Sequence, residues 1–272
     1  MRLAYHDGGS GTPLTPARVP QPTGCCGFVA RNTGLLARPW ILRRSQYRGV
    51  RFSSMTQPVP TDAMTIAFDK TITSEAQLRA VIGAPNARVV SKVIDRLDKH
   101  CRAFIAKSPF VLIATADGQG KVDVSPKGDP AGFVQVLDDY TLAIPERLGN
   151  RLADSFLNIL ARPQVGLLFT VPGKQETLRA GGTARIVQDE WLLEKMAING
   201  KLPQLATVVA VDRVFFHCSK CIMRSHLWEP EAWPDLTGLP TLAQAIIDHA
   251  RLSDSVQQVQ AGLDESYRDR LY

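Results

Sequence analysis

The alternation of apolar and polar residues predicts helices near both ends of the chain and strands in its middle. A short helix is expected to start at Ser74, a favourable N-terminal cap, and to stop at Gly83. A longer helix is expected from 86 to about 107, because one helical face there is apolar: Val90, Val93, Ile94, Leu97, Cys101, Phe104 and Ile105. Pro109 prevents that helix from continuing.

From 109 onward the pattern changes to short apolar or alternating runs separated by turn residues. These runs predict strands at 109–116, 121–128, 133–137, 140–144, 165–172, 176–187 and 206–218. Gly181 and Gly182 predict a bulge or kink in the sixth of them. Helices are expected at 150–160, 190–199 and 242–252. Several short strands at regular spacing are typical of a closed or sandwiched antiparallel sheet.

The positive charge of the chain is concentrated in its first 61 residues. The net charge is +6 over 272 residues, and residues 1–61 alone carry +7, from eight arginines and a single acid, Asp7. The rest of the chain is therefore close to neutral, which argues against a nucleic-acid-binding face. No run of about 18 apolar residues is present, so no membrane span is expected.

The first 61 residues are rich in Gly, Pro, Arg and Ser and show no sustained periodicity, so we expect a disordered leader. Two interpretations are open. The Arg-rich, acid-poor composition resembles a mitochondrial transit peptide, which would place the protein in the mitochondrial matrix. Alternatively the start codon is assigned too early and Met55 is the true start; we favour this interpretation and a cytoplasmic location.

Five cysteines in a chain of this length do not form a disulfide framework, and a reducing compartment is the natural expectation. Cys218 and Cys221 form a CxxC motif that is typical of half a zinc site or of a redox pair. A structural zinc site needs a second pair of ligands, and Cys101 is the only other cysteine after the leader. We therefore expect no metal.

Two loops combine glycine with basic residues, at 125–129 (SPKGD) and 145–151 (PERLGNR). Glycine permits close approach of the backbone, a helix N-terminus presents free N–H groups, and Arg147 and Arg151 add positive charge. Lys127 can supply a further charge from the first loop. The loops predict a phosphate site, and the alternative is a pair of polar turns with solvated charges.

The order of these elements resembles the flavin-binding split barrel. The segments 125–129 (SPKGD), 176–179 (ETLR) and 224–228 (RSHLW) resemble those of a bacterial subgroup of pyridoxamine-phosphate-oxidase-like flavoproteins, over roughly 73–251. The resemblance implies a mainly β fold with flanking helices (α+β), a six-stranded antiparallel FMN-binding split barrel, and a homodimer. The expected parts are the leader 1–61, N-terminal helices at 62–108, the barrel domain with a closing helix at 109–252, and a charged tail at 253–272.

The resemblance also implies where FMN would bind. Its phosphate would lie near Lys127, Arg147, Asn150 and Arg151, with Ser125 and the backbone of Gly128 along the ribityl chain. Arg179 and Arg185 are further candidate cations, of which we favour Arg179.

Arg224 and Trp228 are expected to be contributed by the partner subunit over the isoalloxazine. An indole offers a flat apolar wall, and a guanidinium would stabilise negative charge on reduced flavin. The alternative is that Trp228 is a core aromatic residue that anchors the segment 229–240.

The resemblance has a departure at the C-terminal end. Pyridoxamine phosphate oxidases close with an acidic and aromatic strand and an arginine-rich terminus that holds the substrate phosphate, whereas a helix is expected here. The substrate therefore stays unidentified. We expect an FMN-dependent oxidoreductase that acts on a small molecule, with NAD(P)H as a candidate donor and no catalytic side chain assigned. The alternatives are a non-catalytic flavin-binding or sensing module and a haem or deazaflavin protein on the same barrel.

Overall fold

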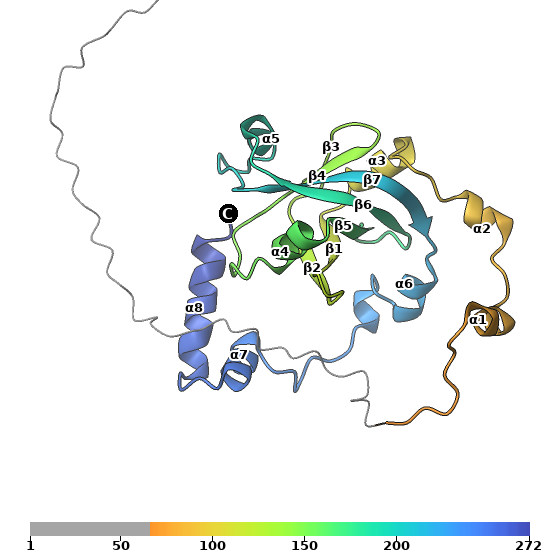
Figure 1. Cartoon of the computed structure of the whole chain (residues 1–272). Helices are drawn as coiled ribbons and strands as arrows, with labels where there is room; N and C mark the ends of the chain where they lie inside the picture. The colour runs from red at the N-terminus through yellow and green to blue at the C-terminus, as the bar shows by residue number, and fades with distance from the viewer. Residues whose placement is uncertain (1–65) are drawn as a thin grey trace, which may run out of the picture. The chain divides into compact units, whose positions relative to one another are not determined.

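The computed structural model describes residues 66–272, and the strands within that range form one antiparallel sheet (Figure 1). The leader at 1–61 lies outside the described residues. The strands are β1 (Phe110–Ala116), β2 (Val122–Gly128), β3 (Gln135–Val136), β4 (Thr141–Pro145), β5 (Gln164–Thr170), β6 (Thr177–Val187) and β7 (Ala206–His217). Their order across the sheet is β2-β1-β5-β6-β7-β4-β3.

One face of the curled sheet encloses the core, and alternate residues of its strands point into that core. In β1 and β5 every second residue is buried, as the alternating pattern of the sequence predicts. Most buried apolar residues of these strands and of β4, β6 and β7 belong to one core with Leu97, Phe104 and Ile105, whereas Ala143 and Ala206 belong to a second, smaller cluster. The expected mainly β split-barrel fold is confirmed. The sheet has seven strands among the described residues instead of the six expected. The shortest of them, β3, pairs with β4 over two residues only.

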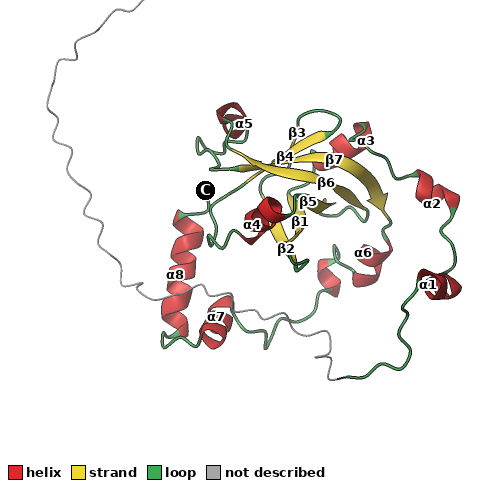
Figure 2. Cartoon of the chain, viewed as in Figure 1, coloured by secondary structure: helices red, strands yellow, loops and turns green. Residues whose placement is uncertain are grey.

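The helices lie around this sheet, as the colouring by secondary structure shows (Figure 2). They are α1 (Glu75–Ile82), α2 (Ala87–Ser91), α3 (Lys99–Ile105), α4 (Asp154–Ala161), α5 (Glu190–Lys195), α6 (Lys220–Ser225), α7 (Leu242–Ala250) and α8 (Val256–Asp269), with a short 3-10 helix at Pro230–Ala232. Helix α4 contacts β1, β6 and β2, and so packs beside the edge strand β2.

The single long helix expected at 86–107 is wrong, because the chain pairs with β7 in the middle of it. The backbone of Ile94 exchanges two hydrogen bonds with Val214, of 2.9 and 2.7 Å. The N–H of Leu97 then donates to the carbonyl of Asp139, at 2.7 Å. Helix α2 therefore ends at Ser91 and α3 starts only at Lys99. The four apolar residues from Leu97 to Ile105 are buried against the barrel without a continuous helix, whereas Val93 and Ile94 are half-buried and Val90 is exposed.

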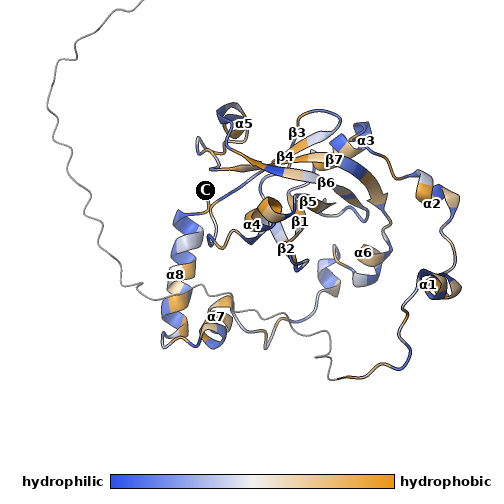
Figure 3. Ribbon diagram, in the orientation of Figure 1, coloured by the Kyte–Doolittle hydropathy of each residue, from blue (hydrophilic) through white to orange (hydrophobic). Residues whose placement is uncertain are grey.

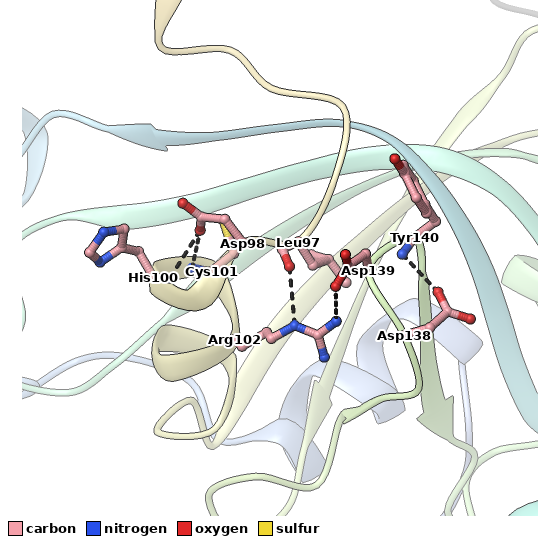
Figure 4. Close-up of polar contacts among 8 residues, drawn as sticks. All are labelled: Leu97, Asp98, His100, Cys101, Arg102, Asp138, Asp139 and Tyr140. Carbon is pink, nitrogen blue, oxygen red and sulfur yellow. Dashed lines mark hydrogen bonds and ion pairs between the residues drawn. The ribbon is translucent and has the colours of Figure 1, made fainter. Parts of the chain in front are cut away.

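Helix α3 is held against the turn between β3 and β4 by polar contacts (Figure 4). Arg102 donates from Nε to the carbonyl of Leu97, at 3.2 Å, and pairs through Nη2 with the carboxylate of Asp139. The carboxylate of Asp98 caps the helix by accepting from the N–H groups of His100 and Cys101, at 3.0 and 2.9 Å. The cap fixes where α3 begins and which residues reach the core.

The cap at Asp98 predicts a pH-dependent loss of stability. The hydrogen bond from the N–H of Cys101 lowers the pKa of Asp98 below its ordinary value of 3.8. The stabilisation is therefore present above that value and is lost as pH falls through the lower folded pKa. Asp98→Ala is expected to reduce the free energy of unfolding by about 1 kcal/mol at neutral pH, with a smaller difference near pH 3.

Urea unfolding of both proteins at the two pH values measures this effect. Asp98→Asn serves as the matched control, because asparagine caps helices about as well as aspartate. A loss from Asp98→Ala that is as large in acid as at neutral pH would contradict the role of the ionised cap.

The C-terminal end of the chain is more ordered than the sequence indicates. Helix α7 follows the prediction for 242–252, but the expected charged tail at 253–272 contains α8. Ser255 and Gln258 form a capping box at its start. Most of α8 is hydrophilic (Figure 3) and none of its residues is buried. In the described part of the chain, no helix combines the length and the apolar character needed to cross a membrane.

Candidate functional site

Side-chain ion pairs join the two sides of the barrel where β2 and β4 end. The ammonium of Lys127, on β2, lies 2.9 Å from Oε2 of Glu146, which follows β4. The guanidinium of Arg147 lies 2.6 Å from Oδ2 of Asp129, whose side chain is 2% exposed. Strand β2 is an edge of the sheet and β4 belongs to the opposite side of the strand order, so these pairs close the barrel at its split.

A polar hollow of about 370 Å³ lies at this split and collects five of the residues that the sequence predicted for the phosphate end of a cofactor. They are Ser125, Lys127, Gly128, Arg147 and Asn150. A second hollow of about 210 Å³ continues from Lys127 and Asn150 to the first turn of α4, at Ser155. The two loops are thus brought together, although they are separated by a hairpin in the sequence.

The local geometry of the second loop differs from the expectation. A helix was expected from Asn150, but α4 begins at Asp154. Arg151 and Ala153 both have left-handed backbone conformations, with φ of 63° and 60°. The side-chain oxygen of Asn150 accepts from the N–H of Leu152, at 3.0 Å, so this residue stabilises its own loop. No side chain caps α4, so no side-chain oxygen at the cap accepts from its first N–H groups.

The cations of the split are not equivalent. Lys127 and Arg147 are each paired with a carboxylate, and Arg147 also donates to the carbonyl of Met196, at 2.8 Å. Arg151 takes part in none of the ion pairs found among residues 66–272. It lines a third hollow, of about 280 Å³, at the end of the same loop. Arg151 is therefore the cation of the loop that has no carboxylate to neutralise it.

Two residues that sequence reasoning missed share this third hollow. Lys201 donates from Nζ to the backbone oxygen of Tyr272, at 3.0 Å. The ring of Tyr272 also lies 5.8 Å from the guanidinium of Arg147, a distance at which a cation and an aromatic face attract each other. The interpretation of 253–272 as a charged tail hid Tyr272. The acidic residues Glu146 and Asp129 belong to the two loops, but the sequence did not identify them as partners of the cations.

An apolar hollow of about 840 Å³ lies on the outer face of the sheet, over β1, β2, β5 and β6. Its floor consists of side chains that point away from the barrel core, and α6 and the segment after it form its wall. The lining includes Phe110, Leu112, Val124, Leu168, Ile222 and Leu227. Val124 also lines the hollow at the start of α4, so the edge strand β2 lies between the apolar and the polar hollows.

Two of the residues predicted to bind the cofactor line the apolar hollow: Arg179, a candidate cation, and Trp228, one of the two predicted ring-contact residues. Arg179 comes from β6, where its guanidinium lies 5.1 Å from the ring centroid of Phe215. Trp228 lies in the wall and donates from Nε1 to the carbonyl of Lys174, at 2.9 Å. The indole is half-buried and is anchored to Lys174, so it is not a core aromatic residue, and its expected place over the isoalloxazine of a partner subunit stays a prediction. Arg224 is exposed on α6 and is not part of the lining.

An antiparallel barrel that is split between β2 and β4, with polar loops at the split, defines the split-barrel class of proteins. Residues 97–218 match the family model described as pyridoxamine 5'-phosphate oxidase. This part of the chain is therefore similar to the pyridoxamine 5'-phosphate oxidase family and has a split-barrel fold. No curated protein matches the chain.

Three similar solved structures each align with less than half of the chain. HupZ of Group A Streptococcus is 20% identical, and the alignment spans 44% of this chain and 92% of HupZ, with a TM-score of 0.36. General Stress Protein 26 of Bacillus anthracis is 16% identical over 42% of this chain and 88% of its own, with a TM-score of 0.34. An FMN-binding protein of Syntrophomonas wolfei is 13% identical over 43% and 83%, with a TM-score of 0.34.

Proposed function

We propose that the protein binds FMN and works as an FMN-dependent oxidoreductase on a small molecule. One observation carries this proposal. A polar hollow lined by Lys127 and a large apolar hollow lie on either side of the edge strand β2, and Val124 of that strand lines both hollows. FMN has matching parts, since it joins a phosphate to a flat apolar ring system through a polar ribityl chain. The similarity of residues 97–218 to the pyridoxamine 5'-phosphate oxidase family supports the same cofactor.

The phosphate would bind at the two loops of the split. Arg151 supplies an unpaired guanidinium, which suits bidentate contact with phosphate oxygens. Lys127 supplies an ammonium from the opposite loop, and Ser125 a hydroxyl. Uncapped N–H groups at the start of α4 favour an anion as well. Arg147 is tied to Asp129 and Met196, so its role is to hold the loop in place.

The ring system of FMN would bind toward the apolar hollow. There it would displace water from the side chains of β1, β2 and β5. Arg179 places positive charge at this surface, which would stabilise negative charge on a reduced flavin. FMN, when bound, supplies the hydride chemistry, and NAD(P)H is the proposed donor. The protein's own residues bind and orient the cofactor and shield it from solvent.

We propose a homodimer, because the outer face of the barrel is left open in one chain. Phe110 and Val124, which line the apolar hollow, are 38% and 54% exposed, and Val122 on the same strand as Val124 is 65% exposed. Contiguous exposed apolar surface of this kind marks interaction sites.

We also propose that the protein works in the cytoplasm, in keeping with the free cysteines of the described region.

An absorbance spectrum of the purified protein tests the proposed function, with the released chromophore identified by mass. We expect two flavin bands and release of FMN, followed by bleaching when NADH or NADPH is added. A Soret band would instead indicate haem. A colourless protein that cannot be reconstituted with FMN would overturn the proposal, and bound flavin that neither nicotinamide reduces would indicate a binding module.

The pairing of Lys127 with Glu146 predicts that this acid weakens cofactor binding. Glu146→Gln removes a negative charge 2.9 Å from the ammonium and leaves Lys127 free for the phosphate. FMN affinity is expected to rise up to about fivefold, as for a partly exposed pair worth up to about 1 kcal/mol. Titration of the apoprotein with FMN measures it, and Glu194→Gln on α5 is the control. An unchanged or weaker affinity would show that Glu146 does not compete with the phosphate.

A further inference from the structure

Cys218 and Cys221 lie on either side of a single backbone turn between β7 and α6. Strand β7 ends at His217 and α6 begins at Lys220. Ser219 has helical dihedral angles, φ −69° and ψ −14°, and its carbonyl accepts from the N–H of Met223, at 3.0 Å. A turn whose two central residues are helical keeps its outer Cα atoms within roughly 7 Å. Disulfides span Cα separations of roughly 4.4–6.8 Å, so the turn suits a bond between these two cysteines.

The two thiols are accessible, in contrast to the third cysteine of the described region. Cys218 and Cys221 are both free and exposed. Cys101 is 2% exposed, and burial together with a hydrogen bond to Asp98 raises its pKa to about 12. Accessible thiols exchange with small disulfides, whereas a buried thiol with a raised pKa does not. Cys101 is thus an internal reference for an unreactive thiol.

The surroundings favour thiol chemistry over metal binding. Within residues 66–272, no cluster of three or more His, Cys, Asp or Glu side chains is arranged to hold a metal ion. Cys221 lines the apolar hollow, as do His217 and Trp228. Lys220 and Arg224 flank the second cysteine and attract anionic thiol compounds.

We propose that Cys218 and Cys221 are a redox-active pair that closes reversibly to an intramolecular disulfide at the rim of the apolar hollow. The oxidant is a small-molecule disulfide of the glutathione type. One cysteine thiolate attacks this disulfide and breaks its S–S bond, which releases one small thiol and leaves a mixed disulfide. The second cysteine attacks the mixed disulfide at the protein sulfur, forms the Cys218–Cys221 bond and releases the second small thiol. Two electrons pass to the oxidant, and the two protons of the cysteines end on the two released thiols.

The disulfide would change the wall of the hollow. It would tie the end of β7 to the first turn of α6, and the adjoining residues Ile222, Leu227 and Trp228 line the hollow. The redox state of the pair would therefore alter what the hollow accepts. This inference does not depend on the proposed FMN binding, because the thiol chemistry needs no flavin.

Peptide mapping of the full-length protein tests the pair. The reduced protein is incubated with oxidised glutathione, blocked with N-ethylmaleimide and digested with trypsin. Cleavage after Lys220 separates the two cysteines, so the disulfide is expected to link the peptides 214–220 and 221–224. Cys101 lies on the peptide 100–102, and the leader cysteines lie on the peptide 19–31. Dithiothreitol is expected to separate the linked peptides.

Variants give the proposal its controls. Cys221→Ser is expected to stop at a stable glutathione adduct on Cys218, and Cys101→Ser is expected to behave like the wild type. Stable glutathione adducts on the wild-type pair would overturn the proposal. So would linked peptides that occur only in covalent dimers on a non-reducing gel.

The effect on the hollow is measured with anilinonaphthalene sulfonate, an aromatic anion. Its fluorescence with wild-type protein is expected to shift between the reduced and oxidised states, and Cys218→Ser is expected to show no such shift. Equal fluorescence in both states of the wild type would overturn the link between the pair and the hollow.

Discussion

Gly182→Ala is expected to destabilise the protein by about 3 kcal/mol or more, which is a large part of the stability of a typical domain. Gly182 lies in β6 where its pairing with β7 shifts register. A Cβ atom at this position would come within 2.0 Å of the carbonyl oxygen of Ala210 and 2.9 Å of its carbonyl carbon. Backbone atoms cannot rotate away as a side chain can, so the two central strands of the barrel would have to separate.

Its neighbour Gly181 provides the matched control. A Cβ atom there would meet the carbonyl oxygen of Val165 at 3.6 Å, which is an ordinary contact. Gly181→Ala is therefore expected to change the free energy of unfolding by less than about 1 kcal/mol. Urea unfolding followed by circular dichroism compares the two variants. Similar midpoints for both would show that the close approach of β6 and β7 is not what requires glycine at 182.

Arg151→Ala is expected to weaken FMN binding about 5- to 150-fold, the loss of one charged hydrogen bond worth roughly 1–3 kcal/mol. Arg151 is the cation of the split that has no carboxylate partner, so its charge is fully available to a phosphate. Lys127→Ala is expected to have an effect of the same order. It removes an ammonium group and also leaves the carboxylate of Glu146 without its partner, close to the phosphate. Quenching of flavin fluorescence by the apoprotein measures both affinities.

Riboflavin separates a phosphate contact from general damage to the site, because it carries the same ring and ribityl chain without the phosphate. Arg151→Ala is expected to bind riboflavin as the wild type does, while it loses affinity for FMN. Arg79→Ala, which removes an exposed arginine of α1, is the control for a lost surface charge. Unchanged FMN affinity in both the Arg151 and the Lys127 variants would place the phosphate elsewhere.

The strands and the turn residues were predictable because both depend on local chemistry. Asp117 illustrates this: its carboxylate accepts from the N–H groups of Gln119 and Lys121, at 2.8 and 2.9 Å, and so closes the hairpin between β1 and β2. The irregularity at Gly181 and Gly182 was likewise predicted, although the additional residue, Asp212, is in β7. The prediction of a helix at 86–107 was wrong because the spacing of apolar residues does not by itself require a helix, and here the backbone of Ile94 pairs with Val214 of β7.

The site was predictable as a set of residue types but not as an arrangement of charges. The loops at 125–129 and 145–151 carry their glycines and cations in the sequence itself, and the resemblance to a known family indicated that they belong together. The partners of those cations could not be read in the same way. Glu146 pairs with Lys127, 19 residues earlier, and Met196 accepts from Arg147 across 49 residues.

The sequence by itself determined the antiparallel strands, the class of fold and the polar loops, because alternation, turn chemistry and glycine act over a few neighbouring residues. Only the tertiary structure decided that Lys127 and Arg147 are neutralised while Arg151 is not, and that Cys221 borders the apolar hollow. The physical reason is distance: an ion pair or a shared hollow depends on which segments the barrel brings together, and no local pattern records that.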